Sequence, residues 1–190
     1  MSAAPRRTDV LVVAATRAEA AGVPEHCPLL VTGIGKVPAA AAVAAALGRM
    51  PDPTAVHVVN VGTAGALRPG VTGLHLPGTV LNHDLSADAV RQLGHDPHEL
   101  LALGTGDPGT VLASGDVFVT DPAVRDALAQ RATLVDMEGY AVAWAAHAAG
   151  ARVTLVKHVS DTADDSAWDW PAQVAASAAV LGEWLEGALG

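Results

Sequence analysis

Short runs of apolar, often β-branched residues alternate along the chain with longer alanine-rich stretches. The apolar runs predict strands at residues 10–14, 29–32, 55–61, 79–81, 110–113, 133–136 and 153–159. Most of them are apolar at nearly every position, which is typical of strands covered on both faces. The alanine-rich stretches predict helices at 38–47, 122–130, 138–149 and 171–188. The alternation therefore predicts an α/β protein in which helices cover a sheet.

Local signals mark several of these boundaries. Asp121 followed by Pro122 is typical of a helix cap and first turn, and Gly150 is placed to end the helix that begins near residue 138. Residues 68–107 are rich in Gly, Pro, His and Asp and form the loosest part of the pattern, without a boundary that separates them as a domain. We expect a disordered tail at 1–8 and one domain over 9–190.

Composition narrows the class of protein. The chain has 190 residues, enough for one sizeable core, and only 3% of them are aromatic. A formal net charge of −9 argues against nucleic-acid binding. The single cysteine, Cys27, excludes an intramolecular disulfide and fits a reducing compartment. With neither a signal-peptide pattern nor an apolar stretch long enough to cross a bilayer, we expect a cytoplasmic protein without membrane contact.

Acidic side chains follow three of the predicted strands. Asp136 and Glu138 come after one strand, Asp161 after another, and Glu19 just beyond the first. Each alone is typical of a surface or capping carboxylate, and Glu138 would be stabilised at a helix start by the helix dipole. Strand ends are also where open α/β sheets bind small ligands. Together the acids indicate a site that cleaves a bond through a cationic transition state.

Two glycine-containing segments, 33–36 and 60–65, are candidate ligand loops. The first lacks the spacing of a P-loop and the third glycine of a dinucleotide fingerprint, which favours a tight strand-to-helix turn over backbone amides that approach a ligand. In the second, glycines would let the backbone approach a sugar or phosphate, and Thr63 supplies a hydroxyl. A simple turn is an equally good interpretation of that segment.

Other chemistry-bearing residues give weaker signals. The following side chains match no compact metal motif and are better explained as solvated loop residues: His83, Asp84, His95, Asp96 and His98. The setting of Cys27 is typical of an inert thiol. Trp168 and Trp170 fit packing or capping roles, with a lid near Asp161 as the alternative.

Taken together, the motifs resemble the nucleoside phosphorylase/nucleosidase superfamily, and within it the methylthioadenosine/S-adenosylhomocysteine nucleosidases. The segments that carry the resemblance are 10–19, 32–47, 60–67, Ser114-Gly115-Asp116 with Phe118, Asp136-Met137-Glu138-Gly139 and Ser160-Asp161. They occur in the order found in that family. The resemblance implies a single-domain, twisted mixed β-sheet flanked by helices, an active site at the strand ends, no metal or cofactor, and a homodimer.

The resemblance also implies a role for each matching residue. Glu19 would be the general base that activates water, and Asp161, steadied by Ser160, would protonate or hydrogen-bond N7 of a purine. The implied substrate-binding residues are Gly65, Thr63 near the sugar and the attacking water, Phe118 and Val119 at the base, and Met137 and Glu138 at the ribose. Such acids suit N-glycosidic cleavage, because positive charge develops on the sugar and negative charge on the leaving base. To hold its proton Asp161 must be partly buried, whereas Glu19 must stay ionised.

The expected activity is hydrolysis of a purine nucleoside, with adenine released from a 5′-modified adenosine such as methylthioadenosine or S-adenosylhomocysteine. Asn60 occupies the position where related phosphorylases carry a phosphate-binding arginine, which favours water as nucleophile, although Arg17 keeps phosphorolysis open. Asp161 favours a 6-amino purine, since relatives that act on 6-oxo purines tend to have asparagine there. A phosphorylase, a futalosine-type nucleosidase and a non-catalytic nucleoside-binding protein remain the alternatives.

The chain also departs from that family. Only 15 residues separate Glu19 from Gly35, which predicts a trimmed N-terminal region without the usual intervening helix and hairpin. Residues 68–107 match poorly as well, and they would build the pocket for the 5′ substituent. The identity of that substituent is therefore open.

Overall fold

The computed structural model describes residues 10–189, apart from the side chains of Asp165, Ser166 and Pro171, so the tail predicted at 1–8 lies outside the described residues. The strands are β1 (Val10–Ala14), β2 (Leu29–Val31), β3 (His57–Ala66), β4 (Leu74–His75), β5 (Pro77–Asn82), β6 (Leu100–Ala102), β7 (Asp107–Ser114), β8 (Leu134–Asp136) and β9 (Arg152–Asp161). The α-helices are α1 (Lys36–Leu47), α2 (Ala87–Gln92), α3 (Pro122–Leu128), α4 (Gly139–Ala148) and α5 (Trp170–Leu189). Short 3-10 turns lie at η2 (Glu19–Gly22), η3 (Pro53–Ala55) and η4 (Asp165–Asp169).

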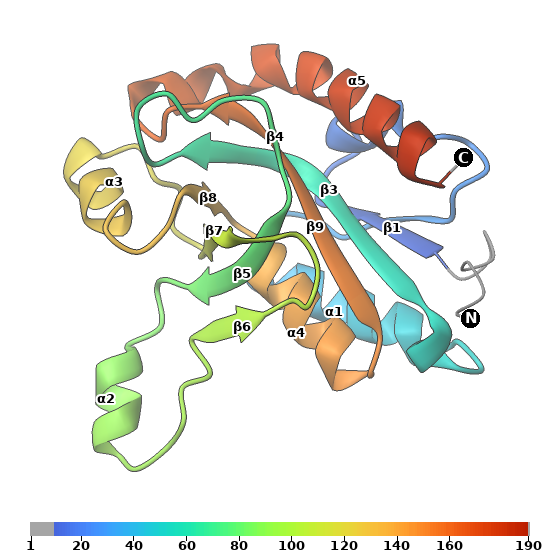
Figure 1. Ribbon diagram of the computed structural model, residues 1–190, viewed down its shortest axis with the longest axis horizontal. Helices are drawn as coiled ribbons and strands as arrows, with labels where there is room; N and C mark the ends of the chain where they lie inside the picture. Colours follow the sequence, from blue (N-terminus) through green and yellow to red (C-terminus); the bar gives the residue numbers. More distant parts are fainter. Residues whose placement is uncertain (1–9, 190) are drawn as a thin grey trace.

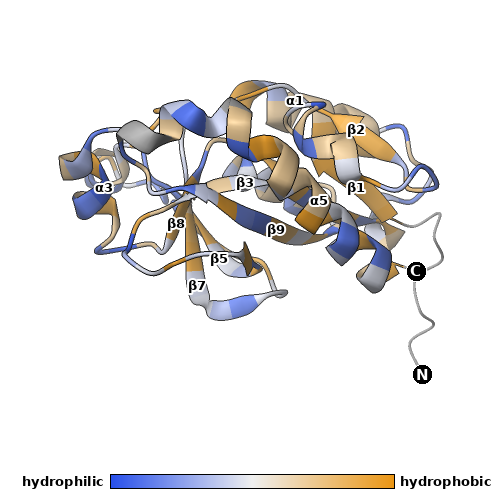
Figure 2. Ribbon diagram, turned by 90° about the horizontal axis from the view of Figure 1, so that it is seen from above, coloured by the Kyte–Doolittle hydropathy of each residue, from blue (hydrophilic) through white to orange (hydrophobic). Residues whose placement is uncertain are grey.

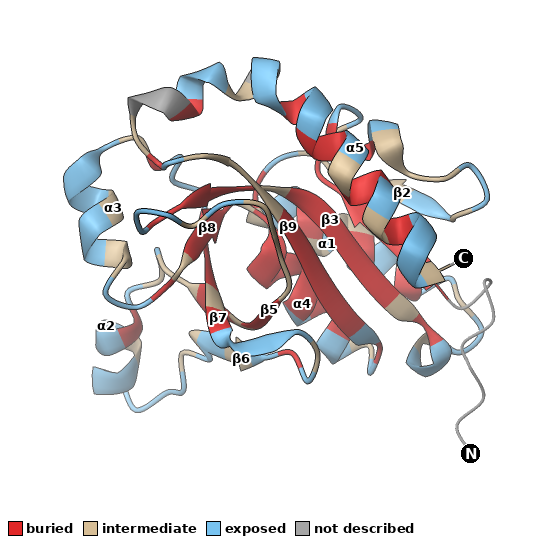
Figure 3. Ribbon diagram, turned by 45° about the horizontal axis from the view of Figure 1, so that its top comes forward, coloured by how far each residue is buried: buried red, intermediate tan, exposed pale blue. Residues whose placement is uncertain are grey.

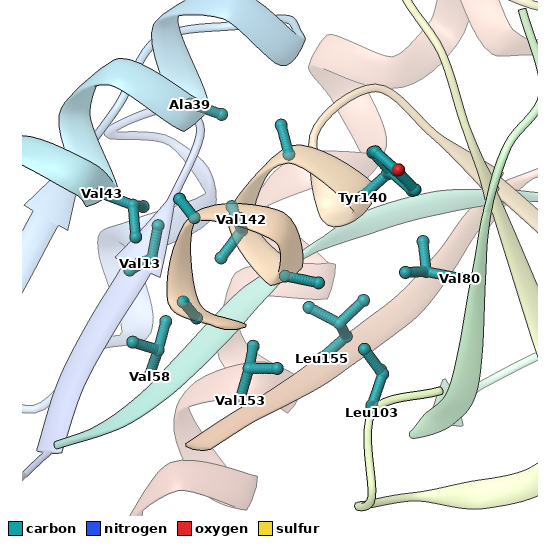
Figure 4. Close-up of a cluster of buried hydrophobic side chains, with 14 of the residues drawn as sticks. Val13, Ala39, Val43, Val58, Val80, Leu103, Tyr140, Val142, Val153 and Leu155 are labelled. Carbon is teal, nitrogen blue, oxygen red and sulfur yellow. The ribbon is translucent and has the colours of Figure 1, made fainter. Parts of the chain in front are cut away.

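These strands form one mixed sheet with helices on both faces (Figure 1). Alternate residues of β1 show why both faces are apolar. Leu11 and Val13 pack in a cluster with α1 and α4, whereas Val10 and Val12 pack in a second cluster with α5. Figure 4 shows the first cluster, and Figure 3 shows buried central strands beneath an α5 whose outer face is exposed. The prediction of a sheet covered on both faces is confirmed.

The sheet changes direction in the middle. β1, β3 and β9 run parallel to one another, and β5, β7 and β8 form a second parallel group. The two groups meet where the end of β3 pairs antiparallel with β8, through Gly65 with Val135 and Ala66 with Leu134. The carboxyl ends of the two groups therefore face each other across this junction, which is a place where sheets of this kind hold ligands.

Most predicted elements are present, often close to their predicted ends. Asp121 caps α3 by accepting a hydrogen bond from the backbone of Ala123, and Gly150 follows α4 in the left-handed conformation. The loose segment 68–107 nevertheless contains β4, α2 and β6, and Figure 1 shows α2 projecting from the body of the fold. Between Glu19 and Gly35 the chain has only η2 and β2, as expected for a trimmed N-terminal region.

The turn considered for residues 60–65 is wrong, because these residues lie inside the ten-residue strand β3. Their glycines serve close approach instead. A Cβ on Gly62 would lie 3.1 Å from Glu19 Oε1, and one on Gly65 would lie 2.9 Å from Asp161 Oδ1. Glycine in a strand thus lets neighbouring carboxylates contact the backbone. Among the described residues, none of the helices has the length and apolar character needed to span a membrane.

Helix α5 meets the turn that carries Glu19 through a contact between two glycines. A Cβ on Gly182 would lie 2.2 Å from the carbonyl oxygen of Gly22, and one on Gly22 would lie 2.0 Å from the carbonyl oxygen of Ala178. Neither position has room for a side chain. The contact fixes the distance between α5 and η2.

We expect Gly182→Ala to lower the free energy of unfolding by about 1–3 kcal/mol, because the new methyl group overpacks a contact between backbones. Gly187→Ala is the matched control on the same helix, since a Cβ added there would have nothing within 4 Å. That change should leave stability unchanged or raise it slightly, because alanine favours helix more than glycine does. Urea unfolding of both variants measures the difference, and equal effects would contradict the proposed contact.

Candidate active site

A cavity of about 390 Å³ lies at the junction between the two parallel groups of strands. It receives residues from the loop after β1, from the carboxyl-terminal part of β3, and from the ends of β8 and β9. Its lining includes every site residue predicted from the sequence: Glu19, Thr63, Gly65, Phe118, Val119, Met137, Glu138, Ser160 and Asp161. Segments that are far apart in the sequence thus converge on one concave surface large enough for a small molecule.

Glu19 is held by four hydrogen bonds. Its side chain lies just beyond β1 and is 6% exposed. Oε2 accepts from the backbone N–H (3.2 Å) and hydroxyl (3.0 Å) of Thr16. Oε1 accepts from the backbone N–H and the hydroxyl of Thr63, both at 2.9 Å. Each carboxylate oxygen therefore has two donors, which fixes the orientation of the group.

Glu138 spans from α4 to the turn before α1. Although it precedes the first residue of α4, its side chain does not cap that helix, and Oε1 instead accepts the backbone N–H of Gly35 at 2.7 Å. Gly33 and Gly35 have φ of 91° and 98°, so the turn depends on glycine at both positions. The strand-to-helix turn predicted here is present, and its amide binds a side chain of the site.

Asp136 serves a different purpose from Glu138. It accepts the backbone N–H of Gly139 at 2.9 Å, as a cap for α4, and a hydrogen bond from the hydroxyl of Ser114. Its Oδ2 also forms an ion pair at 2.8 Å with Lys157 Nζ. Asp136 lines the cavity, whereas none of these three partners does, so we interpret Asp136 as a structural carboxylate of the site.

Lys157 is the cation that sequence reasoning missed. It lies in β9 with only 2% of its surface exposed, and that strand mixes apolar and hydrophilic residues (Figure 2). A lysine inside a buried strand is a detectable signal, because lysine is rarely buried without a partner. Burial alone would lower the pKa of Lys157, but the carboxylates of Asp136 and Glu138 outweigh this effect and raise it. The side chain is therefore charged.

The same surroundings raise the pKa of Glu138, whereas an ion pair alone would lower it. Burial, followed by the negative charge of Asp136, raises the pKa of Glu138 from 4.5 to about 7. Lys157 and the N–H of Gly35 oppose this shift but do not cancel it. Glu138 thus changes its protonation state near neutral pH.

Asp161 is held at the carboxyl end of β9. Its Oδ2 accepts from the hydroxyl of Ser160 at 2.8 Å, and its Oδ1 accepts from the backbone N–H of Ala163 at 2.9 Å. The residue is half-buried. The partial burial predicted for this acid is therefore present.

Aromatic side chains form the outer wall. Phe118 (43% exposed) meets Trp168 (69% exposed) edge to face, with ring centroids 5.3 Å apart. Trp170 also lines the cavity and donates its indole N–H to the Thr63 hydroxyl at 2.8 Å. These contacts fit the lid alternative considered for the two tryptophans better than packing alone.

Other candidates lie away from the cavity. Asn60 is buried in β3, where its amide donates to the carbonyl of Val13 at 3.0 Å, and Arg17 is exposed outside the cavity lining. Asp84 receives a hydrogen bond from Lys36 and another from the backbone of Asp116. In the part of the chain that the structure describes, no three His, Cys, Asp or Glu side chains are grouped to bind a metal ion.

The raised pKa of Glu138 predicts a pH-dependent effect of Glu138→Gln. The folded protein binds this proton more tightly than the unfolded chain, so the stability gained is complete below pH 4.5 and is lost as the pH rises through about 7. Glutamine keeps the acceptor for Gly35 and removes the charge. We expect unfolding free energies near wild type at pH 5 and about 1–3 kcal/mol above it at pH 8.

Urea unfolding at both pH values measures this difference. Glu183→Gln, on the exposed side of α5, is the control and should show no pH-dependent change. A difference between Glu138→Gln and wild type that is the same at pH 5 and pH 8 would contradict the assignment.

Several solved structures share this architecture. A structure of a Helicobacter pylori 5′-methylthioadenosine/S-adenosylhomocysteine nucleosidase mutant, with 5′-methylthioadenosine in its active site, aligns over 94% of this chain and 96% of that one, with a TM-score of 0.78 and 20% identity. The Neisseria meningitidis nucleosidase, in complex with methylthio-immucillin-A, aligns over 93% and 96%, with a TM-score of 0.78 and 21% identity.

Futalosine hydrolase of Helicobacter pylori aligns over 93% of this chain and 95% of its own, with a TM-score of 0.75 and 21% identity. At these identities the likeness shows a shared fold. No curated protein matches the chain by sequence. The model of the phosphorylase superfamily matches residues 24–188, which begins after Glu19 and includes the other predicted site residues. By this match over most of its length, the chain belongs to the phosphorylase superfamily.

Proposed function

We propose that this protein is a nucleosidase that hydrolyses a 5′-modified adenosine, such as methylthioadenosine or S-adenosylhomocysteine, to adenine and the corresponding pentose. The observation that carries the proposal is the convergence of Glu19, Glu138 and Asp161 on one cavity. Membership of the phosphorylase superfamily and the shared fold with nucleosidases that bind methylthioadenosine or its analogue support it.

Glu138 and Met137 are proposed to bind the ribose. Glu138 Oε1 is occupied by the Gly35 amide, whereas no described residue donates a hydrogen bond to Oε2. That oxygen is available to the sugar hydroxyls. A carboxylate at this place also stabilises the positive charge that develops on the ribosyl ring as the glycosidic bond breaks.

Asp161 is proposed to act on the leaving base. The hydroxyl of Ser160 orients its carboxyl group, and Phe118 offers a ring on which a purine can stack. Protonation or hydrogen bonding at N7 relieves the negative charge that the purine acquires. A carboxyl group that faces both N7 and a 6-amino group favours adenine over a 6-oxo base.

Water is the proposed nucleophile. Its oxygen bonds to C1′ while the bond from C1′ to the purine nitrogen breaks. Glu19 takes a proton from the water, which must first replace one of the four donors on its carboxylate, as Asp161 supplies a proton to the base. Thr63 and Gly65 line the same cavity. The described lining contains four carboxylates, with Asp136 as the fourth, and no Arg or Lys. Such a surface disfavours phosphate, which the phosphorylase alternative requires.

The 5′ substituent is proposed to be apolar. Exposed apolar side chains, Ile34, Val117, Phe118 and Trp168, surround the mouth of the cavity. The methylthio group of methylthioadenosine fits these surroundings better than the charged amino-acid end of S-adenosylhomocysteine, so methylthioadenosine is the favoured substrate of the two. We further propose a cytoplasmic homodimer, in which a second copy would cover part of this apolar rim. Futalosine is the second candidate substrate, since a futalosine hydrolase shares the fold.

Incubation with methylthioadenosine, adenosine, inosine and futalosine, each with and without phosphate, tests the activity. We expect adenine release from methylthioadenosine that does not depend on phosphate. A pentose 1-phosphate product would instead establish phosphorolysis. Release of hypoxanthine from futalosine, with no base released from the other nucleosides, would establish the second candidate. Tight binding of nucleosides without release of base would overturn both enzymatic assignments.

Asp161→Asn is expected to lower the rate of adenine release by about 10²- to 10⁴-fold, because the variant cannot donate a proton to the leaving base. Asp88→Asn, an exposed aspartate on α2, is the matched control and should retain the wild-type rate. Thermal unfolding of both variants checks that the fold is intact. Full activity in folded Asp161→Asn would show that another group acts on the base.

A further inference from the structure

We propose that Trp170 is a positioning residue for the general base, acting through the hydroxyl of Thr63. The inference rests on the proposed function, because it concerns the orientation of Glu19 during attack by water. Trp170 is the first residue of α5, 107 residues from Thr63 along the sequence. Trp170 lines the cavity and, through Thr63, is connected to the general base Glu19.

The direction of each hydrogen bond follows from the chemistry of the three side chains. An indole N–H can only donate and an ionised carboxylate can only accept. Trp170 donates to Thr63 Oγ1 at 2.8 Å, and Thr63 Oγ1 lies 2.9 Å from Glu19 Oε1. The Thr63 hydroxyl must therefore direct its proton to Glu19. Trp170 occupies a lone pair that the hydroxyl would otherwise offer to another donor.

The two hydroxyls that hold Glu19 differ in what orients them. Thr16 Oγ1 accepts the backbone N–H of Glu19 itself at 3.2 Å, so its orientation is set within the same turn. Thr63 Oγ1 accepts only from Trp170 among the described residues. Because backbone donors cannot rotate, the Thr63 hydroxyl is the adjustable donor on Oε1. Its state depends on whether Trp170 is in place.

A second contact joins helix α5 to the turn that carries the general base, Glu19. Gly182 of α5 abuts Gly22 at the end of η2, the turn that begins with Glu19. Just before α5, Trp168 contacts Phe118, on which the purine is proposed to stack. The ring of Trp168 therefore contacts the proposed site for the purine. The ring of Trp170 contacts the Thr63 hydroxyl that orients the general base, Glu19. Occupancy of the base site would favour the arrangement in which Glu19 is correctly held.

A double-mutant cycle tests this role. Trp170→Phe keeps an aromatic ring and removes the N–H, and Thr63→Val removes the hydroxyl at nearly constant size. In single-turnover assays with methylthioadenosine, Trp170→Phe should lower the rate constant of adenine release by about 2- to 12-fold, the range for loss of one hydrogen bond. The substrate concentration for half-maximal rate should change little. In the Thr63→Val background, Trp170→Phe should have no further effect.

Trp184→Phe, the same change farther along α5, is the matched control and should retain the wild-type rate. Equal fold-losses from Trp170→Phe with and without the Thr63 hydroxyl would overturn the proposal and leave the nucleosidase activity standing. If wild-type protein releases no base from any nucleoside, the proposed function fails first and this role falls with it.

The hydrogen bond itself has a readout that does not need activity. In ¹⁵N-labelled protein, the indole N–H signal missing from Trp170→Phe identifies Trp170. We expect this signal to exchange slowly with solvent in wild type and much faster in Thr63→Val. Rapid exchange in folded wild-type protein would contradict the bond from which the proposal starts.

Discussion

The buried ion pair between Lys157 and Asp136 allows the acidic side chains of the site to lie close together. Carboxylates that approach one another in an apolar pocket repel, and each resists losing its water. Lys157 pairs with Asp136 at 2.8 Å, and the charges of Glu138 and Glu19 also act on it. Removing one partner of such a buried pair typically costs about 3–5 kcal/mol. A single hidden cation thus lets several acids converge on one cavity.

The backbone is adapted to this charge cluster. A Cβ on Gly62 would lie 3.1 Å from Glu19 Oε1 and 3.3 Å from Lys157 Nζ, so β3 must carry glycine where the two side chains approach it. Each acid is held from a different direction. The turn before α1 provides the amide that binds Glu138. Helix α5 provides Trp170, which donates to the Thr63 hydroxyl that in turn binds Glu19. The site is therefore assembled by both helical layers as well as by the sheet.

Sequence patterns predict the frame of this molecule well, because burial on both faces leaves a strong apolar signal in strands such as β1. The extent of β3 could not be predicted in the same way. Gly62 and Gly65 are typical of turns in local sequence, and only the side chains that approach them explain why they lie in a strand. The division of labour between Asp136 and Glu138 was also hidden, since it depends on the distant Lys157 and Gly35.

We propose that Glu138 binds the sugar and Asp161 the base of an adenine nucleoside in this cavity. A crystal structure with a C-nucleoside analogue of adenosine, whose carbon–carbon link to the base cannot be hydrolysed, tests it most directly. We expect ribose hydroxyls within hydrogen-bond distance of Glu138, the base beside Asp161 and Phe118, and C1′ facing Glu19. An analogue bound in the reverse orientation, or outside this cavity, would contradict it.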